Sequence, residues 1–274
     1  MAQFVNLNPG SLRELHVGNE RLVSYNVEMT EVTGGTFWKA YTPAQIAGTE
    51  PFVLKGGFLG NATASTDLMQ YYDPIDLSDK KLRKLAKEIG PAWVRVSGTW
   101  STKTYYDFDG HTNGVIPEGY NAILTRKQWL GVLDFCKDIG AKLLISVADC
   151  EGLHHADEPW NPSQAEQIFA LSKEYGKAID AAEFVNEPNL LAMSGCPKGY
   201  TAEQYVRDQD IFIRWLHENY PDCSFVGPCS TEGVLKKHGE KAQGGGVGDI
   251  LPQCSTDDLM KGCLLYTSPS SRDS

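Results

Sequence analysis

The sequence lacks several features that would assign the protein to particular classes. It has no apolar stretch long enough to cross a membrane, and its first residues show no basic and apolar regions of a signal peptide. The net charge is −10, which argues against a nucleic acid as the main partner. Seven cysteines are present without a Cys-x-x-Cys pair, so we predict neither a zinc site nor any other metal or cofactor.

Four helices are predicted from their expected ends. The 274 residues and the 41 % apolar content are enough for one large domain with a sizeable core. A hydroxyl side chain three residues before Glu or Gln is typical of a helix start, because each side chain can bind a free backbone amide of the first turn. One predicted helix start is Ser78, which has no Glu or Gln three residues later. The other three are capping boxes: Thr125 with Gln128, Ser163 with Glu166 and Thr201 with Gln204.

Between these helices lie short apolar runs that are typical of buried strands. They occupy residues 22–27, 93–96, 143–147, 182–185 and 224–226. Since they do not alternate cleanly, we expect parallel strands that are covered on both faces. Alternation of strand and helix predicts parallel β-α-β units.

The lengths of the connections indicate which architecture these units form. Links from helix to strand are short and links from strand to helix are long. The long connections therefore lie at the carboxyl ends of the strands. Barrels and doubly wound sheets both place their sites there. No Gly-rich turn follows the first strand, which argues against a nucleotide-binding sheet. We therefore predict an α/β fold, namely a (β/α)8 TIM barrel that is incomplete and contains about strands one to five.

The end of the fourth predicted strand carries the most informative motif, Asn186-Glu187-Pro188. A glutamate in this position can protonate a glycosidic oxygen, so we predict that Glu187 is the general acid/base. Asn186 is predicted to bind the 2-hydroxyl of a sugar. The alternatives are a solvated loop glutamate before a proline, and an asparagine that caps a turn.

The ends of the first two predicted strands supply further polar groups. We predict that Glu28, Gly98, Thr99 and Trp100 bind substrate, although Glu28 could instead pair with a lysine or arginine. Aromatic rings that can stack on sugars are expected at the same face: Phe37, Trp38, Trp100, Tyr105, Tyr106 and Trp160. Adjacent histidines at 154 and 155 are expected to form an exposed loop pair and not a metal site.

Three segments resemble a known family of enzymes. Residues 181–189 are similar to the acid/base strand of clan A glycoside hydrolases. Residues 82–99 resemble the second strand of glycoside hydrolase family 79, the heparanase and β-glucuronidase family, which usually has Gly-Gly-Thr where this chain has Ser97-Gly98-Thr99. Residues 25–28 are similar to the first strand of that family, which ends in an acidic sugar-binding residue.

The resemblance implies a retaining hydrolase that cleaves β-linked glucuronic acid from glycans or glycosides, with Glu187 as acid/base. It implies a nucleophilic glutamate on a seventh strand beyond this chain, so the chain alone is expected to be inactive. It also implies secretion or a lysosome-like compartment, and a companion β-sandwich to which residues 1–20 could belong. Residues 21–262 would form the partial barrel, and residues 263–274 a non-native tail.

Two other functions stay open on the sequence alone. One is a different clan A β-glycosidase that acts on xylosides or glucosides. The other is a carbohydrate-binding protein that does not hydrolyse its ligand. A glucuronic-acid-containing carbohydrate is the expected partner, and this identity comes from the resemblance and not from the residues.

Overall fold

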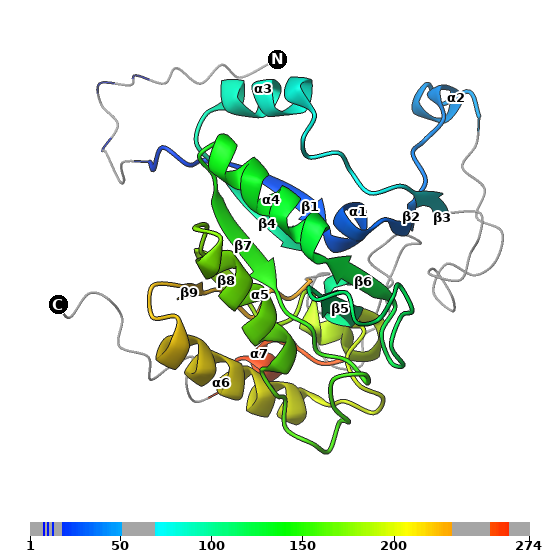
Figure 1. Cartoon of the computed structure of the whole chain (residues 1–274), viewed down its shortest axis with the longest axis vertical. Helices are drawn as coiled ribbons and strands as arrows, with labels where there is room; N and C mark the ends of the chain where they lie inside the picture. Colours follow the sequence, from blue (N-terminus) through cyan, green and yellow to red (C-terminus); the bar gives the residue numbers. More distant parts are fainter. Residues whose placement is uncertain are drawn as a thin grey trace, which may run out of the picture.

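The computed structural model describes residues 18–50, 69–231 and 253–262, together with the single positions 8, 10 and 13. This part of the chain is mixed α/β and is built around a parallel five-stranded sheet (Figure 1). The predicted tail, residues 263–274, lies outside the described residues. Most of the predicted N-terminal segment, residues 1–20, does so as well.

The central sheet contains all five strands that the sequence predicts. Its order follows the chain, and every neighbouring pair is parallel. The strands are β1 (Val23–Glu28), β4 (Ala92–Ser97), β7 (Lys142–Ser146), β8 (Ala181–Glu183) and β9 (Ser224–Phe225). The predicted bounds differ from these by at most two residues.

Helices follow the strands along the chain, and short elements occupy the long strand-to-helix links. Two small sheets were not predicted: β2 (Gly35–Trp38) pairs with β3 (Met69–Tyr72) in antiparallel fashion, and β5 (Thr104–Asp107) pairs with β6 (Ala122–Thr125) in parallel. The helices are α1 (Met29–Thr33), α2 (Pro43–Ile46), α3 (Lys80–Ile89), α4 (Arg126–Asp138), α5 (Ser163–Glu174), α6 (Ala202–Asn219) and α7 (Thr256–Leu259), with 3-10 helices η3 (Ser101–Lys103) and η4 (Pro188–Ser194).

Two of the three predicted capping boxes are confirmed. At the start of α4, the Thr125 side chain accepts from the Gln128 amide, and the Gln128 side chain accepts from the Thr125 amide. Thr201 and Gln204 make the same pair of bonds at the start of α6. These reciprocal bonds fix where both helices begin.

The other two predicted caps are wrong because neighbouring side chains compete for the same groups. Asp79 caps α3, and its carboxylate accepts from the Leu82 amide at 2.7 Å. The Ser78 hydroxyl instead donates to the preceding turn. At α5, Ser163 is already the first helical residue and donates to Asn161 Oδ1 at 2.7 Å.

One face of the central sheet is apolar and packs against helices. Buried residues of α4, α5 and α6 form a single core cluster with this face, and Figure 1 shows α4 and α5 lying over the strands. Successive strand residues point to opposite faces, and every second one is apolar here. The residues of this face are Tyr25, Val27, Val94, Val96, Leu143, Ile145 and Ala182.

The opposite face is polar, and it is partly open in the described part of the chain. It carries Asn26, Glu28, Arg95, Ser97, Ser146 and Glu183. Along β4, buried residues alternate with the half-buried Trp93 and Arg95. The prediction that both faces are covered is confirmed at the carboxyl end of the sheet, where Ser97, Ser146 and Glu183 are buried, although helices pack against the apolar face.

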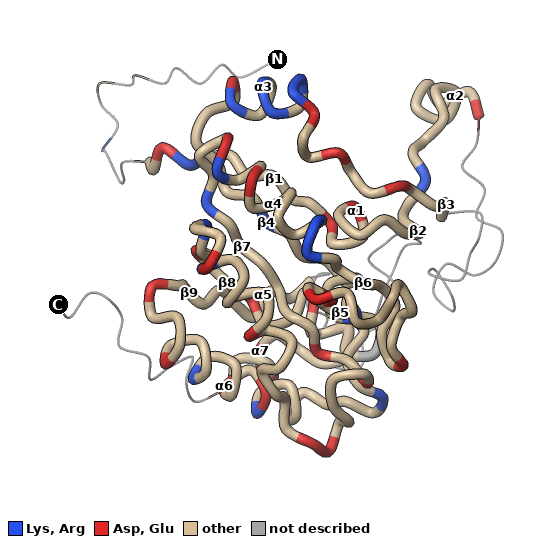
Figure 2. The backbone as a smooth tube through the Cα atoms, in the orientation of Figure 1, with Lys and Arg blue, Asp and Glu red and all other residues tan. Residues whose placement is uncertain are grey.

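Helix α3 lies at the edge of the molecule and is basic. Its ten residues include five lysines or arginines (Figure 2). Lys87 Nζ lies 2.6 Å and Arg83 Nη1 lies 3.3 Å from the carboxylate of Asp138 on α4. Lys80, Lys81 and Lys84 of this helix are exposed. Within the described ranges, we find no helix with the length and apolar character needed to cross a membrane.

Candidate active site

The carboxyl ends of adjacent strands bring Glu28 and Gly98 into contact. Glu28 ends β1, and its register partner Ser97 ends β4, immediately before Gly98. A Cβ atom on Gly98 would lie 1.5 Å from Glu28 Oε2. Gly98 also has a φ of 93°, in the region that favours glycine. Only glycine therefore allows the Glu28 carboxylate to lie over the end of β4.

The Glu28 carboxylate has an unusual environment. Burial raises its pKa, and the negative charges of Glu31 and Glu187 raise it further. A hydrogen bond from Asn26 Nδ2 at 3.2 Å and the charge of Arg95 act in the opposite direction. Its Oε2 atom is buried and has no hydrogen-bond partner among the described residues. This oxygen therefore has unused capacity to accept a hydrogen bond.

Glu187 has a backbone conformation that is uncommon for a residue with a side chain. Its φ is 50°, in the left-handed region. The conformation is fixed by its amide, which donates to Cys229 O at 3.0 Å, and by its carbonyl, which accepts from Ser194 Oγ at 2.5 Å and Leu190 N at 3.0 Å. Strain that is held in this way is often found at functional sites.

The side chain of Glu187 is half-buried and available. Within the described part of the chain, no hydrogen bond or ion pair holds its carboxylate. The charge of Glu187 nevertheless acts on Glu28 and contributes to the raised pKa of that residue. Both residues lie at the carboxyl ends of central strands, Glu28 at the end of β1 and Glu187 shortly after β8.

Arg95 on β4 orients Asn186. Its Nη2 atom donates to Asn186 Oδ1 and to Glu183 Oε1, each at 2.6 Å. Its Nη1 atom donates to Asn26 Oδ1 at 2.6 Å. Because Arg95 occupies the Asn186 oxygen, the amide nitrogen of Asn186 is left to donate its hydrogens elsewhere.

Glu183 is the buried hydrogen-bond acceptor of this network. It is only 1 % exposed and accepts from both Arg95 and Ser97 Oγ. The Ser97 hydroxyl also lies 2.8 Å from Ser146 Oγ on the next strand. A buried charge needs such partners, because an unpaired one is costly in a medium of low polarity.

Arg95 and Glu183 were not among the predicted site residues, although the sequence carries a signal for both. Each is a charged residue inside a short, otherwise apolar run that predicts a buried strand. Charged residues are almost never fully buried unless they are paired. Two opposite charges in nearby strands of one sheet therefore predict a pair.

The remaining predicted binding residues lie beside Gly98. Thr99 and Trp100 are both half-buried. The Trp100 ring meets Phe37 of β2 edge-on, with ring centroids 5.0 Å apart. This contact places β2 next to the loop that follows β4, so Phe37 and Trp100 lie near the Glu28 carboxylate.

Two of the expected ligand-stacking aromatics belong to the core instead. Trp160 is 2 % exposed, donates through Nε1 to Ala148 O, and meets Phe184 and Phe212 edge-on. Tyr106 is fully buried. The prediction that these two rings face a ligand is wrong, because periodicity alone does not separate a core aromatic from a site aromatic.

The adjacent histidines differ from each other, contrary to the prediction of an exposed pair. His155 is exposed and lies 2.6 Å from Glu151. His154 is buried, and its Nε2 lies 2.6 Å from Asp149 Oδ1. The Nδ1 atom of His154 faces two carbonyl oxygens, at 2.9 and 3.1 Å. Since a carbonyl only accepts, Nδ1 must carry a hydrogen, and a second one on Nε2 gives a charged pair with Asp149.

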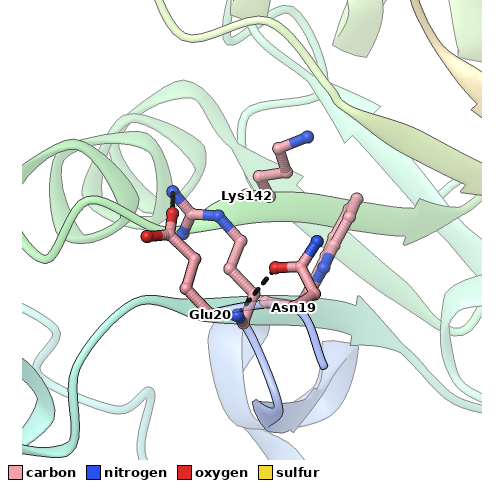
Figure 3. Close-up of a pocket in the computed structure, with 5 residues that line it drawn as sticks. Asn19, Glu20 and Lys142 are labelled. Carbon is pink, nitrogen blue, oxygen red and sulfur yellow. Dashed lines mark hydrogen bonds and ion pairs between the residues drawn. The ribbon is translucent and has the colours of Figure 1, made fainter. Parts of the chain in front are cut away.

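A separate hollow of about 500 Å³ lies at the other end of the strands. Figure 3 shows it beside Asn19, Glu20 and Lys142. Arg21 closes its wall by donating to Ala92 O at 3.2 Å and Gly140 O at 2.8 Å. In parallel α/β folds the amino ends of the strands serve stability and the carboxyl ends serve chemistry. We therefore place the candidate site at Glu28 and Glu187 and not at this hollow.

The site thus contains two carboxylates, an oriented amide and a nearby aromatic pair at one edge of a parallel sheet. A scan against protein-family models found no match for the chain, and neither did a search of curated proteins. The chemistry of the site is therefore inferred from its own residues and from the resemblance of the three segments.

Proposed function

We propose that the protein is a retaining glycoside hydrolase that cleaves β-linked glucuronic acid from glycans or glycosides, in keeping with its resemblance to glycoside hydrolase family 79. One observation supports this most directly. Glu187 has a half-buried carboxylate without a hydrogen-bond partner among the described residues, next to Asn186, whose amide is oriented by Arg95. A carboxyl group that can protonate the leaving oxygen, beside a fixed hydrogen-bond donor for the sugar, is one half of what cleavage of a glycosidic bond requires.

The strand order supports the barrel that this function implies. The five central strands neighbour one another in the order of the chain. A doubly wound sheet reverses its order at a switch point, and no such reversal occurs among the described strands. We propose that these strands are the first five of a (β/α)8 barrel and that their polar face lines its interior.

Each site residue then has a role that its contacts allow. Glu187 protonates the leaving oxygen and afterwards takes a proton from the attacking water. The free amide hydrogens of Asn186 donate to the sugar 2-hydroxyl. The Glu28 carboxylate, which fills the space left by the missing side chain of Gly98, accepts from another hydroxyl through Oε2. Thr99 adds a hydroxyl, and Trp100 an apolar surface for the sugar ring.

The nucleophile is a second carboxylate, about 5–5.5 Å from the first in retaining enzymes. We assign Glu28 to substrate binding and not to this role, because it ends β1, whereas the resemblance implies a nucleophile on a seventh strand. We propose that the nucleophile belongs to a part of the protein outside the described residues. The resemblance also suggests secretion or a lysosome-like compartment.

The replacement Glu187→Gln in the full-length protein tests the proposal. On an alkyl β-glucuronide, whose leaving group needs a proton, we expect the rate to fall by about 10²–10⁴-fold. An aryl β-glucuronide with an acidic leaving group should be affected much less in its first step. Glu118→Gln, an exposed loop glutamate, is the matched control and should leave both rates unchanged.

The same assay separates the other functions. Rates of Glu187→Gln close to wild type on the alkyl substrate would refute the acid/base role. Aryl β-glucosides and β-xylosides measured in parallel would identify another clan A specificity if either is turned over faster. Binding of a glucuronide without turnover by the wild type would indicate a carbohydrate-binding protein.

A further inference from the structure

A second group of polar side chains lies where the chain leaves β5. Asp107 is the last residue of β5, and Asp109 and His111 follow in the loop. Each offers one potential ligand atom, and the three atoms lie within 4.8 Å of one another. This spacing would allow one small cation to contact all three.

Asp107 has an oxygen whose hydrogen-bonding capacity is unused. The residue is 5 % exposed. Its Oδ2 accepts from Thr112 Oγ1 at 2.5 Å and from the Thr112 amide at 3.3 Å. Its Oδ1 is buried and has no hydrogen-bond donor among the described residues. A buried carboxylate oxygen without a donor is costly, and a bound cation would remove that cost.

Oδ1 of Asp107 points into the group, where it forms an ion pair with His111. Asp107 Oδ1 lies 3.1 Å from His111 Nδ1. That nitrogen has at most one hydrogen, and it lies closer to Asp109 Oδ1, at 2.6 Å. The His111 imidazole therefore donates its Nδ1 hydrogen to Asp109 and not to Asp107. The two carboxylates together carry more negative charge than one histidine can balance.

Tyr105 orients the histidine from the other side. Its Oη atom lies 3.1 Å from His111 Nε2, and the two rings meet edge-on. When Tyr105 accepts the Nε2 hydrogen, Nδ1 is left with its lone pair directed at the carboxylates. Histidines that bind metals usually donate the N–H of their other ring nitrogen to an oxygen acceptor.

We propose that Asp107, Asp109 and His111 bind a divalent transition-metal ion, with zinc as the first candidate. Imidazole together with carboxylates suits zinc or manganese, whereas calcium prefers oxygen ligands alone. Water on the exposed side of the loop would complete the coordination. Such an ion would fasten the loop to the end of β5, and this role is independent of the proposed glycosidase activity.

Calorimetric titration of zinc into the chelator-treated chain tests the site. We expect one ion per chain. Asp109→Asn and His111→Gln should each weaken binding at least tenfold. Asp109 is 76 % exposed in its side chain, so its replacement should leave folding intact, which circular dichroism would verify. His155→Gln is the matched control, because His155 also pairs with a carboxylate at 2.6 Å but lies in no such three-residue group.

The outcomes are distinct. Loss of binding in both site variants but not in the control supports the site. Binding should also weaken on acidification, because zinc must displace the Nδ1 proton of His111. Absence of stoichiometric zinc binding by the wild type, or wild-type affinity in His111→Gln, would overturn the proposal. Tight calcium binding that does not need His111 would overturn the assigned class of metal.

Discussion

The two faces of the central sheet are held by different physical means. The helix-covered face is apolar and is stabilised by removal of its side chains from water. The other face has a charged network at its carboxyl end, in which Arg95 connects Asn26, Glu183 and Asn186. The comparison shows that one sheet can separate the residues that stabilise it from those that prepare it for chemistry.

The two faces of the sheet also differ in how strictly they constrain the side chains that they can accommodate. Apolar packing tolerates replacements that keep volume, whereas a network of hydrogen bonds depends on the position of each donor and acceptor. Arg95 can orient Asn186 only while Glu183 holds the guanidinium on its other edge. The polar face should therefore be sensitive to changes that the apolar face would tolerate.

Phe184→Ala tests the apolar face and should give the largest loss of stability. The ring is 1 % exposed and packs against Trp160, Tyr205 and Phe212. Removal of a buried phenylalanine costs about 3–5 kcal/mol, because a cavity adds to the lost burial. Urea denaturation would measure the free energy of unfolding. Ile89→Ala, at a 53 % exposed position, is the control, and an equal loss there would contradict the comparison.

Arg95→Met tests the polar face and should have a somewhat smaller effect. It leaves Glu183 buried without its cation, which costs about 3–5 kcal/mol when both partners are buried. Arg95 is 25 % exposed in its side chain, so we expect about 2–4 kcal/mol.

A double-mutant cycle separates this pairing from loss of volume. Arg95→Met together with Glu183→Met should recover much of the stability, because no charge is then left unpaired. Additive losses would show that the pair is not coupled. The double variant should still lose the orientation of Asn186.

The pH dependence of stability tests the buried pair of His154 and Asp149 and should give the smallest effect. Burial alone would lower the pKa of His154, but the hydrogen bond and charge of Asp149 raise it above its ordinary value. The stabilisation is therefore complete below the ordinary histidine pKa and is lost as pH rises through the folded-state pKa.

Two variants check this assignment. His154→Gln should cost about 1–3 kcal/mol at low pH, the penalty of an unsatisfied buried group, and should remove the dependence on pH. His155→Gln replaces the exposed neighbour and should leave both unchanged. A dependence that survives in His154→Gln would assign the titration to another group.

The sequence was sufficient to predict the central strands and their parallel arrangement. Short apolar runs that alternate with amphipathic segments are compatible with few arrangements other than a parallel sheet covered by helices. Thr125 and Thr201 fixed two helix starts for a local reason, since each bonds within its own first turn. Ser163 failed for an equally local reason, because Asn161 competed for its hydroxyl.

The candidate site was predictable only in part. Asn186 and Glu187 follow a strand, so their position at the edge of the sheet could be deduced. The contact of Glu28 with Gly98 depends on the register of β1 against β4. The network of Arg95 joins residues far apart in the chain. Such tertiary contacts leave little trace in local patterns.

The arrangement of the central sheet also has a consequence for synthesis. Each strand joins the one made before it, so the sheet can grow in the direction in which the ribosome delivers the chain. β4 ends at residue 97 and β7 begins at residue 142. At about 5–20 residues per second, the edge of β4 waits on the order of a few seconds for its partner. During that interval the nascent chain presents an unpaired strand edge, which is where a chaperone would be most useful.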